Sequence, residues 1–494
     1  MKWALISVWD KQGIVDLGRA LSAHGVSIIS SGGTGKALAA GGIAFTEVSA
    51  YTGFPEMMDG RVKTLHPKVH GGLLGRRGID DAVMQSAGIH PIDLLVSNLY
   101  PFREKAAEGL PLEELVEFID IGGPALIRAA AKNFHDVAVV VDPADYPKVG
   151  EALDRGGFTE DERFALARKA FAMTAGYDAA ISNTLHGIGT EFPEVATFQF
   201  DNGRRLRYGE NPHQQGAVYG RSGIAGSRPI QGKEMSYNNY LDLHAATGLV
   251  REFSEPCAVV VKHNNPCGVA VGEDLLRAYI SARNSDPISA YGSVVAFNQI
   301  VGEDLAREIC STYVEVVSAP AFTPEAIVAM KQKENMRVLA LPAAVYGEEL
   351  RTIDGGVLVQ RTPRYTEHWK VITDRDATPD ELRSLQIGWK VCKWARSNAI
   401  VFSDATHAIG IGTGQTSRID AAEIAIEKAL ESLAGTSVAS DGFLPFPDTL
   451  EAAAAAGATA LVQPGGSIRD NEVIAAANRL NMAMVFTGIR HFRH

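Results

Sequence analysis

Short, mainly apolar runs that end in polar turns recur along this chain and limit the folds that it can adopt. In the first third of the chain they lie at Trp3–Val8, Val26–Ile29, Ile92–Val96 and Val137–Val141. Segments with helical spacing follow them, as Ile14, Leu17 and Leu21 follow the first run. Runs of this length predict buried strands, and their alternation with helices predicts an α/β protein. The 49 glycines suit the many tight turns between strand and helix that this class needs.

The chain has 494 residues, which is too long for one hydrophobic core. Such a length predicts roughly two to four domains. The segment Gly187–Gln199 contains Gly, Pro and Thr without a helical period, so we expect a linker there. This divides the chain into predicted domains at residues 1–190 and 200–494. Within the second domain, two runs of strand, polar loop and helix, centred on Lys262 and Asn398, suggest a structural duplication without a residue-level repeat.

Composition narrows the functional classes. Apolar residues make up 46% and charged residues 21% of the chain, as in ordinary soluble globular proteins. The net charge of −11 argues against a general nucleic-acid binder, so local basic clusters must meet any anionic substrate. The four cysteines form no C-x-x-C pair, and we expect neither a disulfide framework nor a metal site. No leader and no run of 18 apolar residues is visible, which predicts a cytoplasmic protein without a membrane segment.

A polar segment directly follows the predicted buried strand Ala258–Val261. It comprises Lys262-His263-Asn264-Asn265-Pro266-Cys267-Gly268, and its Pro and Gly predict a loop at the strand end. Open α/β sheets bind ligands at such ends. An imidazole exchanges protons near neutrality, and a neighbouring ammonium stabilises developing negative charge. Alternatively, Lys262 only extends along the surface and His263 only caps a turn. The H-x-E and P-C-x-x-C pattern of zinc deaminases is incomplete here, so no zinc site is expected.

A second candidate site lies near the N-terminus, at Ser30-Ser31-Gly32-Gly33-Thr34-Gly35-Lys36. A strand, a turn of small residues and a helix N-terminus together form a natural phosphate site, because free N–H groups and the helix dipole face the anion. The segment is not a Walker loop, since Ser30 replaces the first Gly and Ala37 follows the Lys. A plain tight turn is the alternative.

Basic residues gather further along, from Gly60 to His70, where five of ten side chains are basic or imidazole and Pro67 is expected to break any helix. A solvated charge run is the usual explanation of such a cluster. Here, however, the cations alternate with apolar residues, which favours ordered side chains. Pro124 suits the first turn of a helix that carries Lys132, and only the tertiary fold can bring Lys132 near Asp120.

Five segments resemble, in order, the cyclohydrolase half of the bifunctional purine biosynthesis family that joins aminoimidazole carboxamide ribotide (AICAR) formyltransferase to inosine monophosphate (IMP) cyclohydrolase. They are Ser31–Lys36, Gly60–Pro67, Asn98–Phe102, Ile119–Gly123 and Ala129–Asn133. The Lys262 segment resembles the family's Lys-His-x-x-Pro-x-Gly. One departure is Trp9, where the family often has Ser.

Three further segments are similar to the formyltransferase half, and the resemblance extends from Ser7 to His494. Arg204–Gln214 resembles the family's nucleotide-binding R-Y-G-x-N-P-H-Q. Gly410–Ile419 lacks the third Gly and the acidic partner of a dinucleotide site, and instead resembles G-I-G-x-G-Q-x-S-R. Ser440–Asp448 resembles the folate-side segment, with Gly442 in place of Ala.

The resemblance implies a methylglyoxal synthase-like parallel-sheet domain followed by a duplicated, cytidine deaminase-like α/β domain. It implies formyl transfer from 10-formyltetrahydrofolate to AICAR, then closure of the formylated ribotide to IMP, in a homodimer without a metal. The implied catalytic residues are Lys262, His263 and Asn398 for transfer, and Lys63, Tyr100, Asp120 and Lys132 for closure. The implied substrate-binding residues are Lys11, Ser31, Gly32, Gly33, Thr34, Arg61, Thr64, Arg207, Tyr208, Asn239, Gly292, Glu315, Gln415, Ser417, Arg418, Phe443, Asp448 and Arg490.

Two other functions are compatible with parts of the chain. Because the methylglyoxal synthase-like fold also serves as a phosphate-ligand sensor, the first domain is alternatively a regulatory module. A sensor needs the Ser31–Lys36 segment but not Tyr100, Asp120 and Lys132 together, which favours an enzyme. A formyltransferase with a vestigial first domain is the third possibility, and Trp9 is its only support in the sequence.

Overall fold

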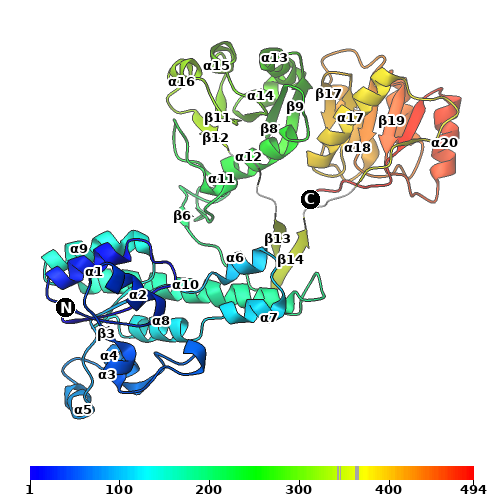
Figure 1. Cartoon of the computed structure of the whole chain (residues 1–494). Coiled ribbons are helices and arrows are strands. Elements are labelled where there is room, and N and C mark those ends of the chain that lie inside the picture. The colour runs from blue at the N-terminus through cyan, green and yellow to red at the C-terminus, as the bar shows by residue number, and fades with distance from the viewer. Residues whose placement is uncertain (342–343, 345–346, 362–365) are drawn as a thin grey trace. The chain divides into compact units, whose positions relative to one another are not determined.

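The computed structural model describes residues 1–341, 344, 347–361 and 366–494. The chain forms two compact units, Met1–Gln199 and Phe200–His494, here called unit 1 and unit 2. Residues 187–199, where a linker was expected, contain neither helix nor strand. Each unit has its own sheets and hydrophobic core (Figure 1).

Unit 1 is built on a parallel five-stranded sheet with the order β3-β2-β1-β4-β5. Its strands are β1 (Trp3–Ser7), β2 (Ser27–Ser30), β3 (Thr46–Glu47), β4 (Leu94–Ser97) and β5 (Ala138–Val140). The four strands expected from the sequence are all present, whereas the short edge strand β3 was not foreseen. Because β1 lies between β2 and β4, the chain changes direction across the sheet at β1, and in such sheets ligands bind beside this position at the carboxyl ends of the strands.

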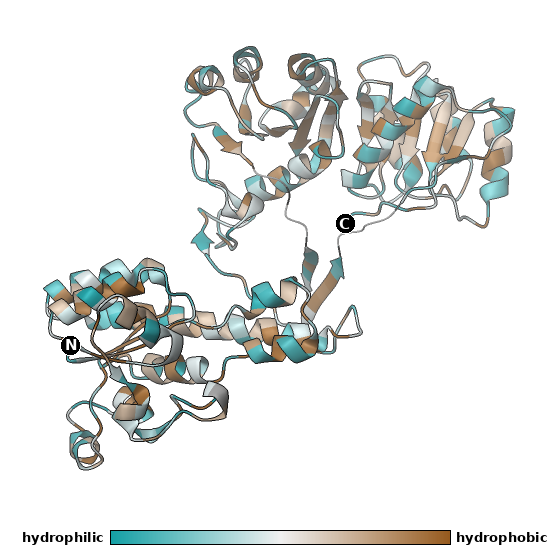
Figure 2. Ribbon diagram, in the orientation of Figure 1, coloured by the Kyte–Doolittle hydropathy of each residue, from teal (hydrophilic) through white to brown (hydrophobic). Residues whose placement is uncertain are grey.

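Helices cover both faces of this sheet. They are α1 (Ile14–Ala23), α2 (Gly32–Ala40), α3 (Val48–Thr52), α4 (Pro67–Leu74), α5 (Asp81–Ser86), α6 (Phe102–Ala107), α7 (Leu112–Leu115), α8 (Gly122–Lys132), α9 (Tyr146–Asp154) and α10 (Glu160–His186). Side chains alternate along each strand. Leu5 therefore packs with α4, α8 and α10, while Ala4 and Ile6 pack with α1, α2 and α9. Figure 2 shows apolar strands beneath helices whose outer surfaces are more polar.

The first half of unit 2 contains a mixed sheet with the order β12-β11-β10-β8-β9. Its elements are α12 (Tyr237–Val250), β8 (Cys257–Lys262), β9 (Asn265–Val271), α13 (Leu275–Ser285), α14 (Pro287–Ala290), β10 (Ser293–Phe297), α15 (Glu303–Cys310), β11 (Val314–Ala319), α16 (Pro324–Met330) and β12 (Arg337–Ala340). Before them come β6 (Arg204–Arg205), β7 (Ala217–Val218) and α11 (Gly223–Gly226).

The second half repeats this arrangement in the sheet β15-β20-β19-β18-β16-β17. Its elements are β15 (Lys370–Val371), α17 (Pro379–Trp394), β16 (Ile400–Ser403), β17 (Ala408–Gly412), α18 (Arg418–Lys428), β18 (Ser437–Ser440), α19 (Asp448–Ala455), β19 (Ala460–Gln463), α20 (Asp470–Arg479) and β20 (Ala483–Phe486). In both sheets two antiparallel pairings are followed by two parallel ones, so β9-β8-β10-β11-β12 corresponds to β17-β16-β18-β19-β20. The expected duplication is therefore present in the topology.

One core cluster joins the two halves of unit 2. It contains Val259 and Val261 from β8, Val401 from β16, and residues of α12 and α17, which lie between the sheets. A separate antiparallel hairpin, β13 (Glu348–Ile353) and β14 (Gly356–Arg361), is largely exposed.

Two local expectations are wrong. The Lys262 segment is a tight hairpin rather than a loop: β8 ends at Lys262 and β9 begins at Asn265, so the Pro and Gly expected to break the chain lie within a strand. Pro266 follows the first residue of that strand, where a missing donor is tolerated. Pro67 does not break a helix but begins one, as the first residue of α4, because its own N–H would have no partner there.

Candidate active sites

The first turn of α2, where the sequence predicts a phosphate site, lies against two lysines in unit 1. Ser31 occupies the N-cap position without a side-chain capping hydrogen bond, and Gly32 has a φ of +58°, which residues with a side chain rarely adopt. A Cβ atom at Gly32 would lie 3.2 Å from Lys63 Nζ, and one at Gly33 would lie 3.3 Å from Lys11 Cε. Two lysines from separate segments therefore lie against the start of the helix, whose free N–H groups already favour an anion.

A group of polar residues lies beside this helix terminus. Asp120 Oδ1 accepts a hydrogen bond from Gly123 N–H at 2.8 Å, and the N–H of Asp120 donates to the Tyr177 hydroxyl at 2.8 Å. Burial raises the pKa of the Asp120 carboxyl, although the hydrogen bond from Gly123 and the charge of Lys63 oppose this. Burial also raises the pKa of Tyr100, and the charges of Asp120 and Glu56 add to the effect. Asp120 thus lies close enough to both Lys63 and Tyr100 to interact with each of them electrostatically.

Three other predicted residues of unit 1, Thr64, Arg61 and Lys132, lie in different surroundings. Thr64 adjoins the start of α8, since a Cβ at Gly122 would lie 3.0 Å from its hydroxyl oxygen. Arg61 forms an ion pair with Glu117. The structure does not bring Lys132 to Asp120, because Lys132 is the last residue of α8 and Asp120 precedes the first, about 15 Å apart along the axis.

In unit 2, the turn between β8 and β9 presents His263. Both turn residues have positive φ, +53° at His263 and +62° at Asn264, as a two-residue hairpin turn of primed type requires. Asp242 of α12 holds the turn by accepting the N–H of Asn264 at 2.5 Å. Burial raises the pKa of Asp242, against the opposing effect of the His263 and Asn264 groups. Lys262 donates to the carbonyl of Tyr291 at 2.6 Å.

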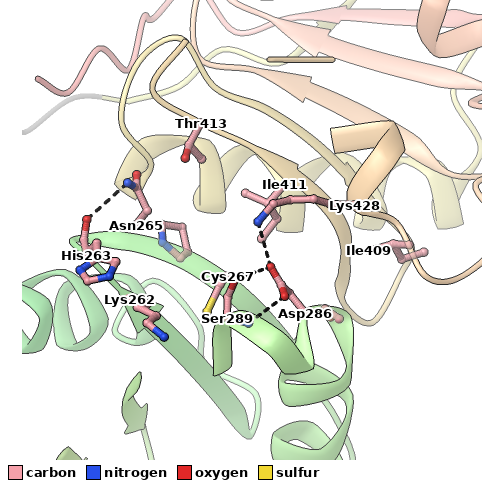
Figure 3. A pocket seen from close by; sticks show the side chains of 12 residues that line it. Lys262, His263, Asn265, Cys267, Asp286, Ser289, Ile409, Ile411, Thr413 and Lys428 are labelled. Atoms are coloured by element: carbon pink, nitrogen blue, oxygen red, sulfur yellow. Dashed lines mark hydrogen bonds and ion pairs between the residues drawn. The ribbon is translucent and has the colours of Figure 1, made fainter. Parts of the chain in front are cut away.

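The hairpin borders a cavity of about 230 Å³. The hairpin supplies Lys262, His263, Asn265, Pro266 and Cys267, the segment around α14 supplies Ser285, Asp286 and Ser289, and the second half supplies Ile409, Ile411, Thr413 and Lys428. Figure 3 shows Thr413, Ile411 and Lys428 of the second half opposite Asn265 and Asp286 of the first, with a Lys428–Asp286 ion pair of 3.0 Å between the halves. Burial opposes ionisation of Asp286, but bonds from Ser289 and Lys428 outweigh it and lower the pKa.

Asn398 lies close to the hairpin, because the N–H of Arg396 donates to Asn265 Oδ1 at 3.0 Å. The side-chain amide of Asn398 donates to the carbonyls of Gln415 at 2.8 Å and Thr416 at 3.1 Å. The structure therefore brings together the Lys262 and Asn398 segments, which the sequence separates by more than a hundred residues.

A buried network supports the segment that precedes Asn398. Ser397 Oγ donates to Asp441 Oδ2 at 2.6 Å and accepts the N–H of Arg493 at 3.0 Å. Asp441 is fully buried and also pairs with Arg418. The predicted substrate ligand Arg418 is thus committed to an internal ion pair, with its side chain 9% exposed.

Several other predicted ligands also have internal partners. Asn239 is 4% exposed, completes the capping box of α12 with Ser236, and donates to Glu315 Oε2 at 2.9 Å. Ser417 caps α18 by accepting the N–H of Asp420. Gly292 has a φ of +76° and donates to the Tyr313 carbonyl at 2.7 Å.

The remaining predicted ligands lie at or near the surface. The Arg207 guanidinium stacks 5.5 Å from the ring centre of Tyr208. Gln415 is half-buried, whereas Phe443, Asp448 and Arg490 are exposed. These positions leave their side chains accessible to a ligand.

Sequence reasoning missed Asp286 and Lys428, which line the cavity. Asp286 precedes Pro287 at the start of α14, a recognisable helix-start signal. No local signal marks Lys428, because its partner lies 142 residues away. Asp441 lies in the Ser440–Asp448 segment that the sequence singles out, but its contact with Ser397 follows only from the fold.

Within the described residues, no group of three or more His, Cys, Asp or Glu side chains could hold a metal ion. No described helix has both the length and the apolar character needed to cross a membrane.

Comparisons with known proteins cover both units, and the boundary between the two family matches lies within unit 1, between residues 125 and 130. The family described as "AICARFT/IMPCHase bienzyme" matches residues 130–428, and "MGS-like domain" matches residues 13–125. "Bifunctional purine biosynthesis protein PurH" of Acidithiobacillus ferrooxidans is 50% identical and covers 99% of both chains. The protein of the same name from Magnetococcus marinus is 49% identical and covers 100% of this chain and 99% of its own.

Among solved structures, "Crystal structure of ForH" is 34% identical and covers 39% of this chain and 100% of its own. Its TM-score of 0.34 establishes no common fold. The full-length identities and the match over more than half of the residues decide the assignment: the chain belongs to the AICARFT/IMPCHase bienzyme family.

Proposed function

We propose that the two activities of this bifunctional purine biosynthesis enzyme are divided between its units, with IMP cyclohydrolase in unit 1 and AICAR formyltransferase in unit 2. The predicted domains at residues 1–190 and 200–494 agree with this division. Two observations support it: lysines converge on the first turn of α2 beside Tyr100 and Asp120, and the His263 turn meets the Asn398 segment at a cavity.

In unit 2, formyl transfer joins the 5-amino group of AICAR to the formyl carbon of 10-formyltetrahydrofolate. This amine is conjugated with the imidazole and is a weak nucleophile, so a base must take its proton as the bond forms. His263 is assigned as that base, because it is exposed at a turn that Asp242 holds. Lys262 stabilises the oxyanion, and the tetrahydrofolate nitrogen leaves with a proton.

Asn398 holds the substrate in register in this proposal. Its amide N–H groups already bind the carbonyls of Gln415 and Thr416, which leaves its amide oxygen as the group for the substrate. The exposed Arg207 and Tyr208 are assigned to the nucleotide phosphate, and Phe443 and Asp448 to the folate.

In unit 1, the carboxamide nitrogen of the formylated ribotide attacks its own formyl carbon, and water leaves. Ring closure within one molecule needs chiefly positioning and stabilisation of the oxyanion. The phosphate lies on the first turn of α2 with Lys11, while Lys63 and Tyr100 face the reacting oxygen and Asp120 orients them. Lys132, which the resemblance also assigns to closure, is the last residue of α8, and its part in the reaction stays a prediction.

The enzyme is proposed to be a cytoplasmic homodimer that uses neither nucleic acid nor a metal. Support for association comes from the β13–β14 hairpin, where Ile353, Val357 and Leu358 are 51%, 43% and 55% exposed. A lone two-stranded hairpin is at best marginally stable in water, so a second copy of the chain is the expected cover.

Paired variants of the full chain test the division of labour. His263→Ala should slow formyl transfer by ~10²–10⁴, the usual loss of a general base, while cyclisation of the preformylated ribotide stays unchanged. Lys63→Ala should do the reverse. Each reaction is assayed separately on both variants, and each variant serves as the control for the other. Parallel loss of both reactions in either variant would refute the assignment.

A further inference from the structure

Trp9 occupies a fixed position beside Lys11 and Tyr100 of the proposed unit 1 site. It follows β1, and the N–H groups of Trp9 and Asp10 both donate to Asn98 Oδ1, at 2.6 and 2.9 Å. The Asn98 amide returns a bond to the Asp10 carbonyl at 3.1 Å. Because Asn98 follows β4, these bonds tie the carboxyl ends of two neighbouring strands together at the position where β1 and β4 meet. The backbone is thus held, yet the Trp9 side chain is 45% exposed.

The indole ring of Trp9 is near both chemically distinct parts of the site. Lys11 Nζ is 5.9 Å from the ring centre and donates to the Trp9 carbonyl at 2.9 Å. The ring centre of Tyr100 lies 5.0 Å away at an interplanar angle of 58°. Phe118 meets the indole edge-on at 6.2 Å and 75°. The indole therefore contacts the lysine assigned to the anion and the tyrosine assigned to the reacting oxygen.

A ribotide has a matching arrangement, with a phosphate at one end and a planar heterocycle at the other. When its phosphate lies on the first turn of α2 with Lys11, its heterocycle extends toward Tyr100 and passes the indole. Stacking a flat ring on the half-exposed indole stabilises the complex in two ways. It removes apolar area from water, and the two rings attract each other beyond that burial.

We propose that Trp9 forms the stacking wall for the substrate heterocycle in unit 1 and so determines specificity for ring-bearing ribotides. The inference rests on the proposed cyclohydrolase function of unit 1. Trp9 is a positioning residue that carries no proton or charge, and its removal should act on affinity more than on the chemical step.

The test compares Trp9→Ala and Trp9→Phe with the control Trp3→Phe, at the opposite end of β1, where Trp3 stacks on His90 at 4.7 Å. Stacking on an aromatic side chain corresponds to roughly a five- to hundredfold change in affinity. For Trp9→Ala we expect both the KM for cyclisation and the Kd for IMP to rise by roughly five- to hundredfold. The kcat should stay within a few-fold of that of the unsubstituted enzyme. Trp9→Phe should keep most of the affinity, and Trp3→Phe all of it.

Two further measurements separate stacking from a purely structural role. IMP should quench the tryptophan fluorescence of the unsubstituted enzyme and of Trp3→Phe, but much less that of Trp9→Phe. The melting temperature of Trp9→Ala should stay near that of the unsubstituted enzyme. An unchanged KM and Kd in Trp9→Ala, or a lowered melting temperature without loss of affinity, would overturn the stacking role of Trp9 but leave the proposed function of unit 1 intact. Absence of both cyclisation and IMP binding in the unsubstituted enzyme would overturn the proposed function as well.

Discussion

The hydroxyl group of Thr34 bridges the two backbone groups of Val8 at the end of β1. It donates to the Val8 carbonyl at 2.9 Å and accepts the Val8 N–H at 3.0 Å, and the residue is 3% exposed. The sequence placed Thr34 among the substrate ligands, but its hydroxyl joins α2 to β1. In the proposed site, the anion is bound by backbone N–H groups of the first turn of α2 and by the lysines, while the Thr34 side chain holds the helix in place.

Substitution of Thr34 should therefore act on stability. Thr34→Val keeps the shape but leaves a buried N–H and carbonyl without partners, which should cost about 1–3 kcal/mol of unfolding free energy. Thr34→Ser keeps the hydroxyl and serves as the matched control. Urea denaturation of both variants measures the cost. If Thr34→Val instead raised the KM for cyclisation with no change in stability, the hydroxyl would belong to the substrate site.

At the scale of elements, the Glu367 carboxylate holds the C-terminal segment around His491 against α17. Glu367 accepts hydrogen bonds from Trp369 Nε1 at 2.8 Å and Trp389 Nε1 at 2.9 Å, and its carboxylate lies 3.4 Å from His491 Nε2. The N–H of His491 in turn donates to the Asp441 carbonyl. Through Asp441 and Ser397 this segment supports the residues around Asn398, so a contact distant from the cavity helps to shape it.

The Glu367 carboxylate should make stability depend on pH. Burial opposes its ionisation, but the bonds from His491, Trp369 and Trp389 outweigh burial and lower its pKa from 4.5 to about 2. The folded state thus binds fewer protons than the unfolded state between these values. The stabilisation, roughly 3 kcal/mol, is present above about pH 4.5 and is lost as the pH falls toward about 2.

Urea denaturation at several pH values measures this effect. The difference in unfolding free energy between the unsubstituted enzyme and Glu367→Gln should narrow as the pH is lowered from about 6 to about 3. Glu334→Gln, at an exposed carboxylate, is the control and should show a nearly constant difference. If the difference in unfolding free energy between the unsubstituted enzyme and Glu367→Gln stayed constant over this pH range, the predicted pH dependence would be wrong.

At the scale of the whole molecule, the two units have separate sheets and separate cores. In unit 1, both faces of a single parallel sheet are covered by helices from residues 1–199 alone. In unit 2, each half has a hydrophobic cluster of its own, but the two repeated sheets also share a third cluster, so neither half buries all of its apolar surface by itself. The first unit is thus expected to fold alone, whereas the halves of the second are expected to need each other.

A fragment of residues 1–199 tests this independence. It should melt cooperatively and cyclise the formylated ribotide at a rate near that of the full chain, because every residue assigned to that reaction lies within it. Circular dichroism and the cyclisation assay on one preparation measure both properties. A folded fragment without cyclisation would mean that the site needs residues from unit 2 or from a second copy of the chain.

The sequence by itself determined the α/β class, four of the five strands of unit 1 and the irregular segment at residues 187–199. These depend on local periodicity and on turn and helix-start signals, which neighbouring residues supply. The hairpin at His263 escaped this reasoning because Pro266 and Gly268 usually signal a break, yet here β8 pairs with them across the turn.

Only the tertiary structure decided which of these segments meet. Lys11 and Lys63 converge on α2, Arg396 binds Asn265, and Lys428 binds Asp286 because the sheets bring distant segments together. The same packing separates Lys132 from Asp120 and commits Thr34 and Arg418 to internal bonds. A motif shows which functional groups a chain carries, but their partners depend on contacts between residues far apart in the sequence, which only the folded backbone sets.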